Sequence, residues 1–426
     1  MGLAGGQPNN REEPMSQSKP FALPKLAVWE AFKKVRANRG AAGVDGQSIE
    51  EFEQNLSGNL YKLWNRLASG SYMPPAVRRV EIPKATGGTR PLGIPTVADR
   101  IAQMVVKDVL EPKLEPCFHA DSYGYRPHRS AHDALKVARQ RCWKTDWVLD
   151  VDIQGFFDNI DHGLLMRAVR KHTDCKWVLL YIERWLTASV QMPDGTVQLR
   201  DKGTPQGGVI SPLLANLFLH YTFDMWMTRE FPVIRFERYA DDVVIHCKSL
   251  AQATMLHDKL LQRLAECKLE LSPSKTKIVY CKDRERAQEY KEINFDFLGY
   301  TFRPRKSVSK DGDVSLNFLP AISGKAAKAI RQTVRDWNLK RKVRISLEEI
   351  ARRINPVVRG WMVYYGRFYR SALCRVVAQV DLHLAKWIVH KHKRVRGNLA
   401  KAYEWLRRIR RTKPGSFAHW DLDYQS

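Results

Sequence analysis

The sequence predicts a mixed α/β (α+β) region, followed by an all-helical domain and a basic C-terminal segment. First, 426 residues with 44% hydrophobic and 10% aromatic side chains suffice for about three folded units. Second, strand-like runs alternate with helical patterns up to about residue 320, and only helical spacing follows. Third, Lys and Arg crowd residues 391–413, where Glu404 is the one acid. This composition excludes an intrinsically disordered chain.

The charge distribution predicts a polyanionic partner. The chain holds 71 Lys and Arg against 45 Asp and Glu, a formal net charge of +26. Residues 321–426 alone hold 25 basic and 7 acidic residues, so most of the excess lies in the last quarter. Aromatic residues interleaved with these charges favour nucleic acid over a membrane surface. These aromatics are Trp337, Trp361, Tyr364, Tyr365, Phe368, Trp387 and Trp405.

Cysteine use and hydropathy predict a soluble protein of a reducing cytosol. The seven cysteines include no C-x-x-C pair, and the sequence shows no secretory leader. We therefore expect neither a disulfide framework nor a structural zinc site. The longest mainly apolar stretch, 213–219, is too short to span a bilayer.

The first third of the chain predicts helices interrupted by one hairpin. Residues 1–20 lack apolar periodicity and are typical of a mobile extension. Residues 26–67 have helical spacing around a Gly-rich loop, and residues 72–95 alternate around a Gly-Gly turn as a hairpin does. A helix is expected at about 97–110, and another after Ser130, whose hydroxyl suits an N-cap.

One strand carries two acids on a single face. Strict alternation over 148–153 places Leu149, Val151 and Ile153 on one face and Asp150 and Asp152 on the other. A backbone-permissive loop at 204–208 then precedes a long apolar helix from Ser211 to about Met227. The remaining α/β elements are predicted as strands at 233–239 and 243–247 joined by a tight turn at 240–242, a helix at 250–269, and strands at 276–280 and 294–302.

The clustered acids suggest a metal-dependent reaction on phosphates. Asp152 alone could simply pair with an arginine or face solvent, but Asp241 and Asp242 place like charges side by side in one hairpin turn. Such a turn is unfavourable unless a cation lies between the acids. If the hairpin adjoins the Asp152 strand, three carboxylates face one cleft, which suits two Mg²⁺ ions about 4 Å apart that clamp a phosphoryl displacement. We therefore predict a phosphoryl transferase that acts on nucleic acid.

Ordered sequence blocks resemble the group II intron type of reverse transcriptase, in a form without the C-terminal HNH endonuclease domain. The blocks are IPKATGGTRPLGIP (82–95), SYGYRPHRSAHDAL (122–135), FFDNID (156–161), GTPQGGVISPLLAN (203–216), YADD (239–242), FLGY (297–300) and INPVVRGWMVYYG (354–366). The resemblance implies a right-hand polymerase fold with a helical thumb, or maturase X, domain. Its parts are expected at 1–20 (mobile extension), 21–147 (fingers with part of the palm), 148–312 (palm), 313–390 (thumb) and 391–426 (basic nucleic-acid-binding segment).

The resemblance also implies roles for individual residues. Two Mg²⁺ ions are expected on Asp152 and Asp241, with Asp242 in support and the Ile153 carbonyl as a further ligand; Asp150 is expected to be structural. Lys84 and Arg90 match residues that bind the dNTP triphosphate, and Gln206 matches one near its sugar and base. Phe156 matches the residue that excludes a 2′-hydroxyl, with Phe157 as the alternative. Expected nucleic-acid contacts are Lys275, Leu298 and Gly299 for primer and template, and Arg352, Arg353 and Arg359 for RNA.

The family resemblance implies an RNA-directed DNA polymerase that binds its group II intron RNA to assist splicing. It also implies intron mobility by target-primed cDNA synthesis on target DNA, within the bacterial cytosol and at the nucleoid. Without an endonuclease domain, mobility is expected to depend on DNA that is already open. Two alternatives stay open: an RNA-binding splicing cofactor with a vestigial polymerase site, and a domesticated reverse transcriptase used in DNA repair or phage defence.

Overall fold

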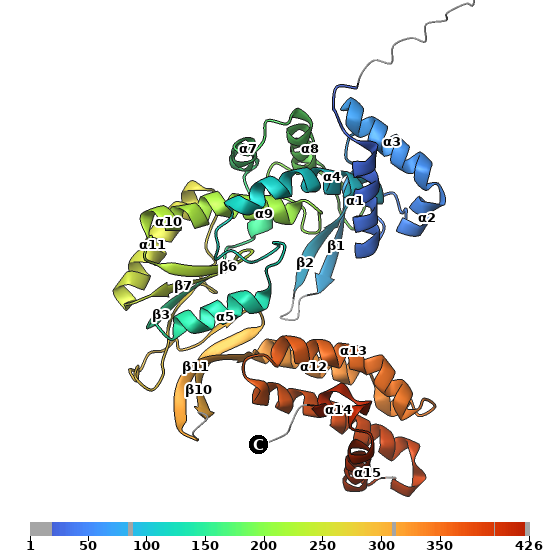
Figure 1. The fold of residues 1–426 in the computed structure, drawn as a ribbon, viewed down its shortest axis with the longest axis vertical. Coiled ribbons are helices and arrows are strands. Elements are labelled where there is room, and N and C mark those ends of the chain that lie inside the picture. The colour runs from blue at the N-terminus through green and yellow to red at the C-terminus, as the bar shows by residue number, and fades with distance from the viewer. Residues whose placement is uncertain (1–18, 84–87, 309–311, 396, 422–426) are drawn as a thin grey trace, which may run out of the picture.

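The computed structural model describes residues 19–83, 88–308, 312–395 and 397–421 (Figure 1). Its N-terminal layer is helical and consists of α1 (Lys25–Asn38), α2 (Ile49–Gln54), α3 (Leu56–Ser69) and α4 (Val97–Leu114). The helix–loop–helix predicted at 26–67 is confirmed, with the second helix divided at Asn55. Ser48 begins α2 with a reciprocal capping box to Glu51. The predicted extension at 1–20 lies almost entirely outside the described residues.

A β-hairpin follows the first three helices and confirms the prediction for 72–95. Strands β1 (Val77–Pro83) and β2 (Thr89–Ile94) pair antiparallel, with Ile82 opposite Arg90. Two short strands, β4 (Val190–Gln191) and β5 (Val197–Gln198), extend the sheet in the order β2-β1-β4-β5. Lys84 lies outside the described residues.

The central sheet has the strand order β6-β7-β3-β8, with every neighbouring pair antiparallel. Its strands are β3 (Trp147–Val151), β6 (Arg235–Tyr239), β7 (Asp242–Cys247) and β8 (Lys277–Tyr280), all within two residues of their predicted positions. The surrounding helices are α5 (Ala131–Cys142), α6 (Phe156–Asn159), α7 (His162–Arg170), α8 (Lys176–Thr187), α9 (Ser211–Leu219), α10 (Met225–Glu230) and α11 (Leu250–Glu266).

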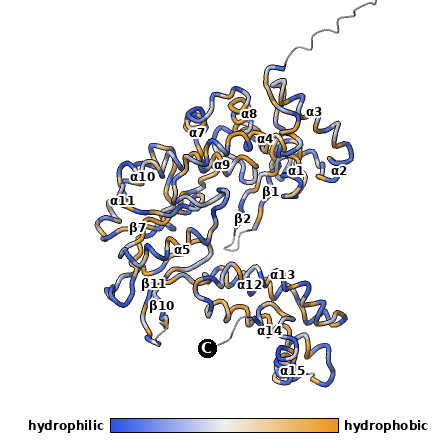
Figure 2. The backbone as a smooth tube through the Cα atoms, viewed as in Figure 1, coloured by the Kyte–Doolittle hydropathy of each residue, from blue (hydrophilic) through white to orange (hydrophobic). Residues whose placement is uncertain are grey.

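Both faces of β3 are buried, because different elements cover them. Leu149 and Val151 belong to a large core that also takes in α4, α9 and α11. Val148 belongs to a smaller core built with α5 and the strands after residue 294. Figure 2 shows the concentration of hydrophobic residues along α4 and α9. Val148 and Asp150 lie on the same face of β3. The smaller core therefore covers this face only as far as Val148, and the acids follow it.

The predicted apolar helix after Ser211 is present but contains a π-turn. Helix α9 continues through a π-helical segment, His220–Asp224, into α10, so the helical run reaches Glu230. A π-turn inserts one residue into the helical ladder and is often found near functional sites.

The prediction of one strand at 294–302 is wrong. This segment forms β9 (Phe295–Phe297) and β10 (Tyr300–Val308), which are joined by a two-residue turn at Leu298 and Gly299 with φ of 51° and 79°. Positive φ at both central residues matches the right-handed twist of a tight hairpin. Strand β10 then pairs along its length with β11 (Val314–Ile322), so the predicted palm–thumb boundary at 312/313 falls inside a hairpin.

The all-helical domain begins after β11 and includes the basic C-terminal segment. Its helices are α12 (Gly324–Asp336), α13 (Leu347–Tyr365), α14 (Arg370–Lys391) and α15 (Leu399–Thr412). Leu406, Phe417 and Trp420 are buried in the same core as Trp387. The basic segment is therefore integrated into the helical domain, whereas the charge pattern suggested a separate appendage. Throughout the ranges that the structure describes, every helix falls short of the length and apolarity needed to cross a bilayer.

Candidate active site

The strand register brings the predicted carboxylates together. Strand β3 pairs with β7, with Val151 opposite Val243. Asp152 directly follows β3, Asp241 lies with Ala240 in the turn between β6 and β7, and Asp242 begins β7. Asp152 and Asp242 line a cavity of about 840 Å³, together with Asp150 from the same face of β3. Segments 89 residues apart in the sequence therefore supply acids to one cleft.

The environment of the cleft disfavours the charged form of its acidic side chains. Loss of hydration, and then the negative charges of Asp241 and Asp152, raise the pKa of Asp242 to about 6. Loss of hydration likewise raises the pKa of Asp241, with Asp152 adding to the effect. Burial and the neighbouring Asp242 raise the pKa of Asp150 to about 8. A nearby cation would stabilise the charged form of these carboxylates.

Lys275 supplies a cation to Asp152. Its ammonium lies 3.0 and 3.2 Å from the two carboxylate oxygens of Asp152. Lys277, opposite Asp150 on β8, lines the same cavity and opposes the rise in the pKa of Asp150. Within the described part of the chain, no three His, Cys, Asp or Glu side chains are already gathered around one point. Lys275 is therefore the cation that pairs with Asp152 in this structure.

The Ile153 carbonyl is directed toward the Asp241 turn. Ile153 forms an antiparallel bridge with Leu271, and the residues on either side of this pair make its hydrogen bonds. Ser272 N–H donates to the Asp152 carbonyl at 2.8 Å, and Gln154 N–H donates to the Glu270 carbonyl at 2.9 Å. In such an antiparallel pair, the N–H and C=O of Ile153 point to the opposite side of the strand. That side faces β7, because β3 lies between β7 and β8.

Two of the nucleotide-binding candidates, Gln206 and Arg90, lie on the loop before α9 and on the β1–β2 hairpin. Gln206 lies in a cavity of about 420 Å³ between the β1–β2 hairpin and the loop before α9, which also includes Arg79 and Arg200. The Gln206 carbonyl accepts a hydrogen bond of 2.7 Å from Gly93 N–H, so the hairpin and the loop are tied together. Arg90 lies on β2 and is close enough to Tyr125 to affect its pKa.

The two adjacent phenylalanines differ in exposure. Phe156 is only 2% exposed and belongs to the large core. Phe157 is half-buried and packs against that core from the edge. Helix α6 places them 100° apart, so only one can enter the core. The available ring is therefore that of Phe157, whereas the sequence comparison favoured Phe156.

Leu298 and Gly299 line the acid cavity, together with Tyr365 and the start of α12. A Cβ on Gly299 would lie 3.3 Å from the Tyr365 hydroxyl. The Tyr364 hydroxyl donates a hydrogen bond of 2.9 Å to the Leu298 carbonyl. The β9–β10 turn thus lies between the acids and the helical domain.

The arginines expected to bind RNA are exposed on α13 and do not line the acid cavity. They are Arg352, Arg353 and Arg359, and Arg353 forms an ion pair with Glu349 one turn earlier.

A basic groove of about 680 Å³ continues from the acid cavity. The two share Asn294, Thr301 and Gly324. The groove runs between β10 and helices α12 and α14, and none of its described lining residues is acidic; its basic residues are Arg303, Arg305, Lys306, Arg331 and Arg375. Sequence inspection missed this feature, since its arginines come from three elements. The i, i+2 spacing of Arg303 and Arg305 was the available signal.

Two further residues near the site carried no signal in their local sequence. Tyr125 has φ of 57°, and Asp241, Asp242 and Arg90 all influence its pKa, so its half-exposed ring lies near the acids. Arg238 is completely buried beneath the turn formed by Ala240 and Asp241. Its position in a strand of alternating residues predicts a buried side chain, but not its partners.

Comparisons with known proteins identify the family of this chain. The family model for reverse transcriptase (RNA-dependent DNA polymerase) matches residues 82–302, and that for the group II intron maturase-specific domain matches residues 327–405. Protein YkfC of Escherichia coli strain K12 is 33% identical over 320 residues, which are 65% of this chain and 80% of that protein. Group II intron-encoded protein LtrA of Lactococcus lactis is 27% identical over 98% of this chain and 80% of its own length. The chain belongs to the group II intron reverse transcriptase and maturase family, whose two domains support RNA-directed DNA polymerisation and assistance to splicing.

Proposed function

We propose that this cleft joins a dNTP to the 3′ end of a primer that is paired with an RNA template. One observation carries the proposal: Asp152 and Asp242 line one cavity, with Asp241 beside them in the turn, and this cavity opens into a basic groove that has no acid among its described lining residues. An acid cluster that faces a basic groove suits a reaction at the end of a polyanionic strand, because the groove binds phosphates while the acids hold cations.

The donors fit two Mg²⁺ ions. Carboxylate oxygens of Asp152, Asp241 and Asp242 and the Ile153 carbonyl are hard ligands of the kind that Mg²⁺ prefers. The raised pKa values of Asp241 and Asp242 indicate a site in which negative charge lacks sufficient compensation. When bound, the ions would favour the nucleophilic 3′-hydroxyl and neutralise the pyrophosphate. Lys275 would then be released from Asp152 and could pair with a phosphate of the substrate.

The fingers hairpin and the adjoining loop would hold the nucleotide. Arg90 has a planar guanidinium that can bind two phosphate oxygens at once, and Lys84 would add a point charge. Phe157 would press on the deoxyribose and disfavour a 2′-hydroxyl, since its ring is the accessible one of the pair. Gln206 would lie beside the sugar or base, on a loop tied to the hairpin through Gly93.

The helical domain would bind nucleic acid on two sides. The basic groove along β10 and α12 would bind the sugar-phosphate backbone of the primer strand, next to Leu298 and Gly299. The exposed arginines of α13, Arg352, Arg353 and Arg359, would contact the folded intron RNA. We place this activity in the bacterial cytosol, with cDNA synthesis primed from target DNA at the nucleoid.

Primer extension on an RNA template, with dNTPs and Mg²⁺, tests the proposed chemistry. An Asp241→Ala, Asp242→Ala variant should bind the RNA–DNA hybrid as the parent does but extend no primer, because it lacks the acids of the turn. A matched control is Asp194→Ala, which removes an exposed acid of the β4–β5 loop that lies in neither the acid cavity nor the groove.

Extension by the parent and by Asp194→Ala, with none by the double variant, supports the proposal. If no protein extends primers while all bind intron RNA tightly, the function is that of a splicing cofactor with a vestigial polymerase site. A role in DNA repair or phage defence would instead show as extension without any stimulation of intron splicing.

A further inference from the structure

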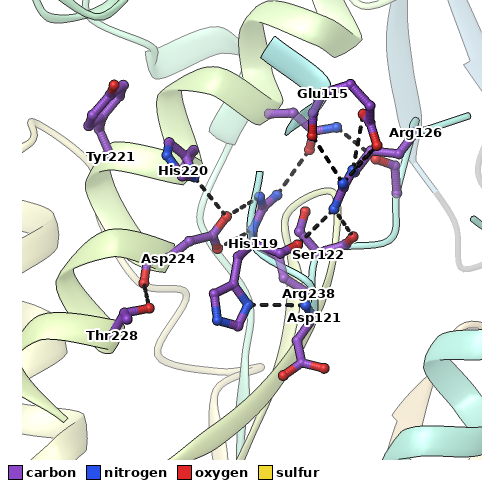
Figure 3. Close-up of polar contacts among 12 residues, drawn as sticks. Glu115, His119, Asp121, Ser122, Arg126, His220, Tyr221, Asp224, Thr228 and Arg238 are labelled. Carbon is purple, nitrogen blue, oxygen red and sulfur yellow. Dashed lines mark hydrogen bonds and ion pairs between the residues drawn. The ribbon is translucent and has the colours of Figure 1, made fainter. Parts of the chain in front are cut away.

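A completely buried ion pair lies directly beneath the catalytic turn. Arg238 on β6 donates from Nε and Nη2 to the two carboxylate oxygens of Asp224, at 2.7 and 2.6 Å. Both side chains have zero exposure. Figure 3 shows this bidentate pair between the end of the π-turn and the strand that leads to the acids. Desolvation makes such a pair costly, so fold stability alone is a weak explanation for it.

The same guanidinium also binds the catalytic turn itself. Its Nη1 donates to the Ala240 carbonyl and to the Asn216 side-chain carbonyl, each at 3.0 Å. Ala240 is the residue before Asp241 and has φ of 57°, a left-handed conformation that is unfavourable for a residue with a Cβ. Arg238 therefore links the helix α9–α10 to the strained peptide that places Asp241.

Two neighbouring contacts hold the other side of this turn. Asn216 donates from its side-chain nitrogen to the Gly124 carbonyl at 2.6 Å. Gly124 packs so closely that a Cβ there would lie 2.3 Å from the Ala240 nitrogen. The backbone of residues 121–123 pairs with β6 on both sides of Arg238: Arg238 N–H donates to the Asp121 carbonyl, and Tyr123 N–H to the Arg238 carbonyl. The turn is thus enclosed by the side chains of Arg238 and Asn216 and the backbone of Gly124.

The π-turn provides the counter-charge. Asp224 is its last residue, and Arg263 stabilises the turn by donating to the carbonyls of Tyr221 and Thr222 at 3.1 and 3.0 Å. His220 lies 3.9 Å from Asp224 (Figure 3). Burial lowers the pKa of His220 to about 4, so this histidine is neutral and Arg238 is the cation that compensates Asp224.

We propose that Arg238 is a positioning residue for catalysis: through the Ala240 carbonyl it fixes the Asp241 turn at the place where the metal ligands must converge. The inference rests on the proposed chemistry at Asp241. Arg238 touches neither substrate nor metal, and it acts through the backbone of the turn. A shift of about 1 Å in a catalytic group can reduce the rate about 100-fold, so the contact matters even where the fold survives without it.

The test replaces the buried pair with apolar residues of similar size. The double variant Arg238→Met, Asp224→Leu removes both charges, a change that often leaves stability unaltered. We expect it to fold with a Tm close to the parent's, to lose about 100-fold in kcat, and to keep KM for dNTP within about threefold. We also expect Mn²⁺, the probe used for the metal site by electron paramagnetic resonance, to bind about tenfold more weakly.

Two further variants keep the result interpretable. Arg238→Lys retains the positive charge opposite Asp224, but its single nitrogen cannot bind both Asp224 and the Ala240 carbonyl. We therefore expect the same loss of kcat and of Mn²⁺ affinity. This variant tests the inference even if the double variant does not fold. Glu237→Gln is the matched control: Glu237 is also fully buried and ion-paired on β6, to Arg141 and His246, and does not contact the turn. It should lower Tm while leaving kcat per folded molecule unchanged.

The inference is overturned if the folded double variant, or Arg238→Lys, has the parent's kcat and Mn²⁺ affinity. Arg238 would then serve the fold alone. Failure of the proposed function would give a different result. A parent protein that binds Mn²⁺ but extends no primer would rule out the polymerase chemistry. The Mn²⁺ affinities of the variants would still test the position of the turn.

Discussion

Two tight hairpin turns flank the acid cleft, and they are held in different ways. The turn between β6 and β7 carries Asp241, and buried polar groups of its own domain fix it through Arg238 and Gly124. The turn between β9 and β10 carries Leu298 and Gly299, and aromatic side chains of the helical domain hold it. Each turn has a non-glycine residue at positive φ, Ala240 or Leu298, so each requires support from outside.

The second turn is coupled to the helical domain through an aromatic cluster. Tyr364 and Tyr365 at the end of α13 pack against Tyr300, and Tyr300 donates to the Tyr364 carbonyl. His132 on α5 lies 2.8 Å from the same carbonyl. A movement of the helical domain would therefore reach Leu298 through a direct hydrogen bond, whereas the same cluster meets the first turn only at Tyr239, at the end of β6. The difference indicates that the turn proposed to carry the chemistry is held by groups of its own domain, whereas the turn proposed to lie beside the primer is held by the helical domain.

The largest effect is expected from Gly124→Ala. A Cβ at this position would lie 2.3 Å from the Ala240 nitrogen, a backbone atom that cannot give way without moving Asp241. We expect kcat to fall about 100-fold with primer affinity unchanged, as measured by single-nucleotide extension. Gly360→Ala on α13 is the control, since nothing lies within 4 Å of its Cβ. Equal kcat for parent and Gly124→Ala would mean that the first turn is not rigidly fixed.

A smaller effect, of a different kind, is expected from Gly299→Ala. Its φ of 79° costs an alanine about 1 kcal/mol, but the nearest group is the Tyr365 hydroxyl at 3.3 Å, which can move aside. We expect KM for the primer–template to rise about fivefold and kcat to change less than twofold. A kcat loss as large as that of Gly124→Ala would contradict the proposed difference between the turns.

Tyr364→Phe sharpens the comparison by removing one hydrogen bond. The lost bond runs from the Tyr364 hydroxyl to the Leu298 carbonyl and is worth about 1 kcal/mol. We expect shorter products in extension assays with a trap for released enzyme, and an unchanged rate of the first addition. Tyr181→Phe is the matched control, because its hydroxyl donates to the Leu67 carbonyl of α3 and neither residue lines the acid cavity or the basic groove. Loss of the first addition in Tyr364→Phe would show that the helical domain also affects the chemistry.

The smallest effect on activity is expected from Asp150→Asn, which tests stability instead. With a pKa of about 8, Asp150 binds a proton in the folded protein at pH values where the unfolded chain has lost it. Wild-type stability should therefore fall as pH rises from about 4 to 8, at up to about 1.4 kcal/mol per unit. Asp150→Asn removes this pH dependence. The free energy of unfolding of the variant, measured with denaturant, should exceed that of the parent by an amount that grows toward pH 8 and vanishes near pH 4. An equal gain at both values would contradict the raised pKa.

Much of the site could be predicted from local sequence, because period-two alternation fixes which residues share a face. That rule placed Asp150 and Asp152 together, and the like charges of Asp241 and Asp242 indicated a cation site. Turn chemistry was less informative. Leu298 does not favour positive φ, so the hairpin between Phe297 and Tyr300 looked like continuous strand.

Local sequence was sufficient for the first helices, the β1–β2 hairpin, the four strands of the central sheet with their acids, and the basic character of the last quarter. Tertiary structure decided which groups hold those acids in place. Arg238, Asp224 and Gly124 come from three separate segments, and nothing in the spacing of one segment reports a contact with another. It also decided that Phe417 and Trp420 close the core of the helical domain, since burial depends on which surfaces meet rather than on local charge.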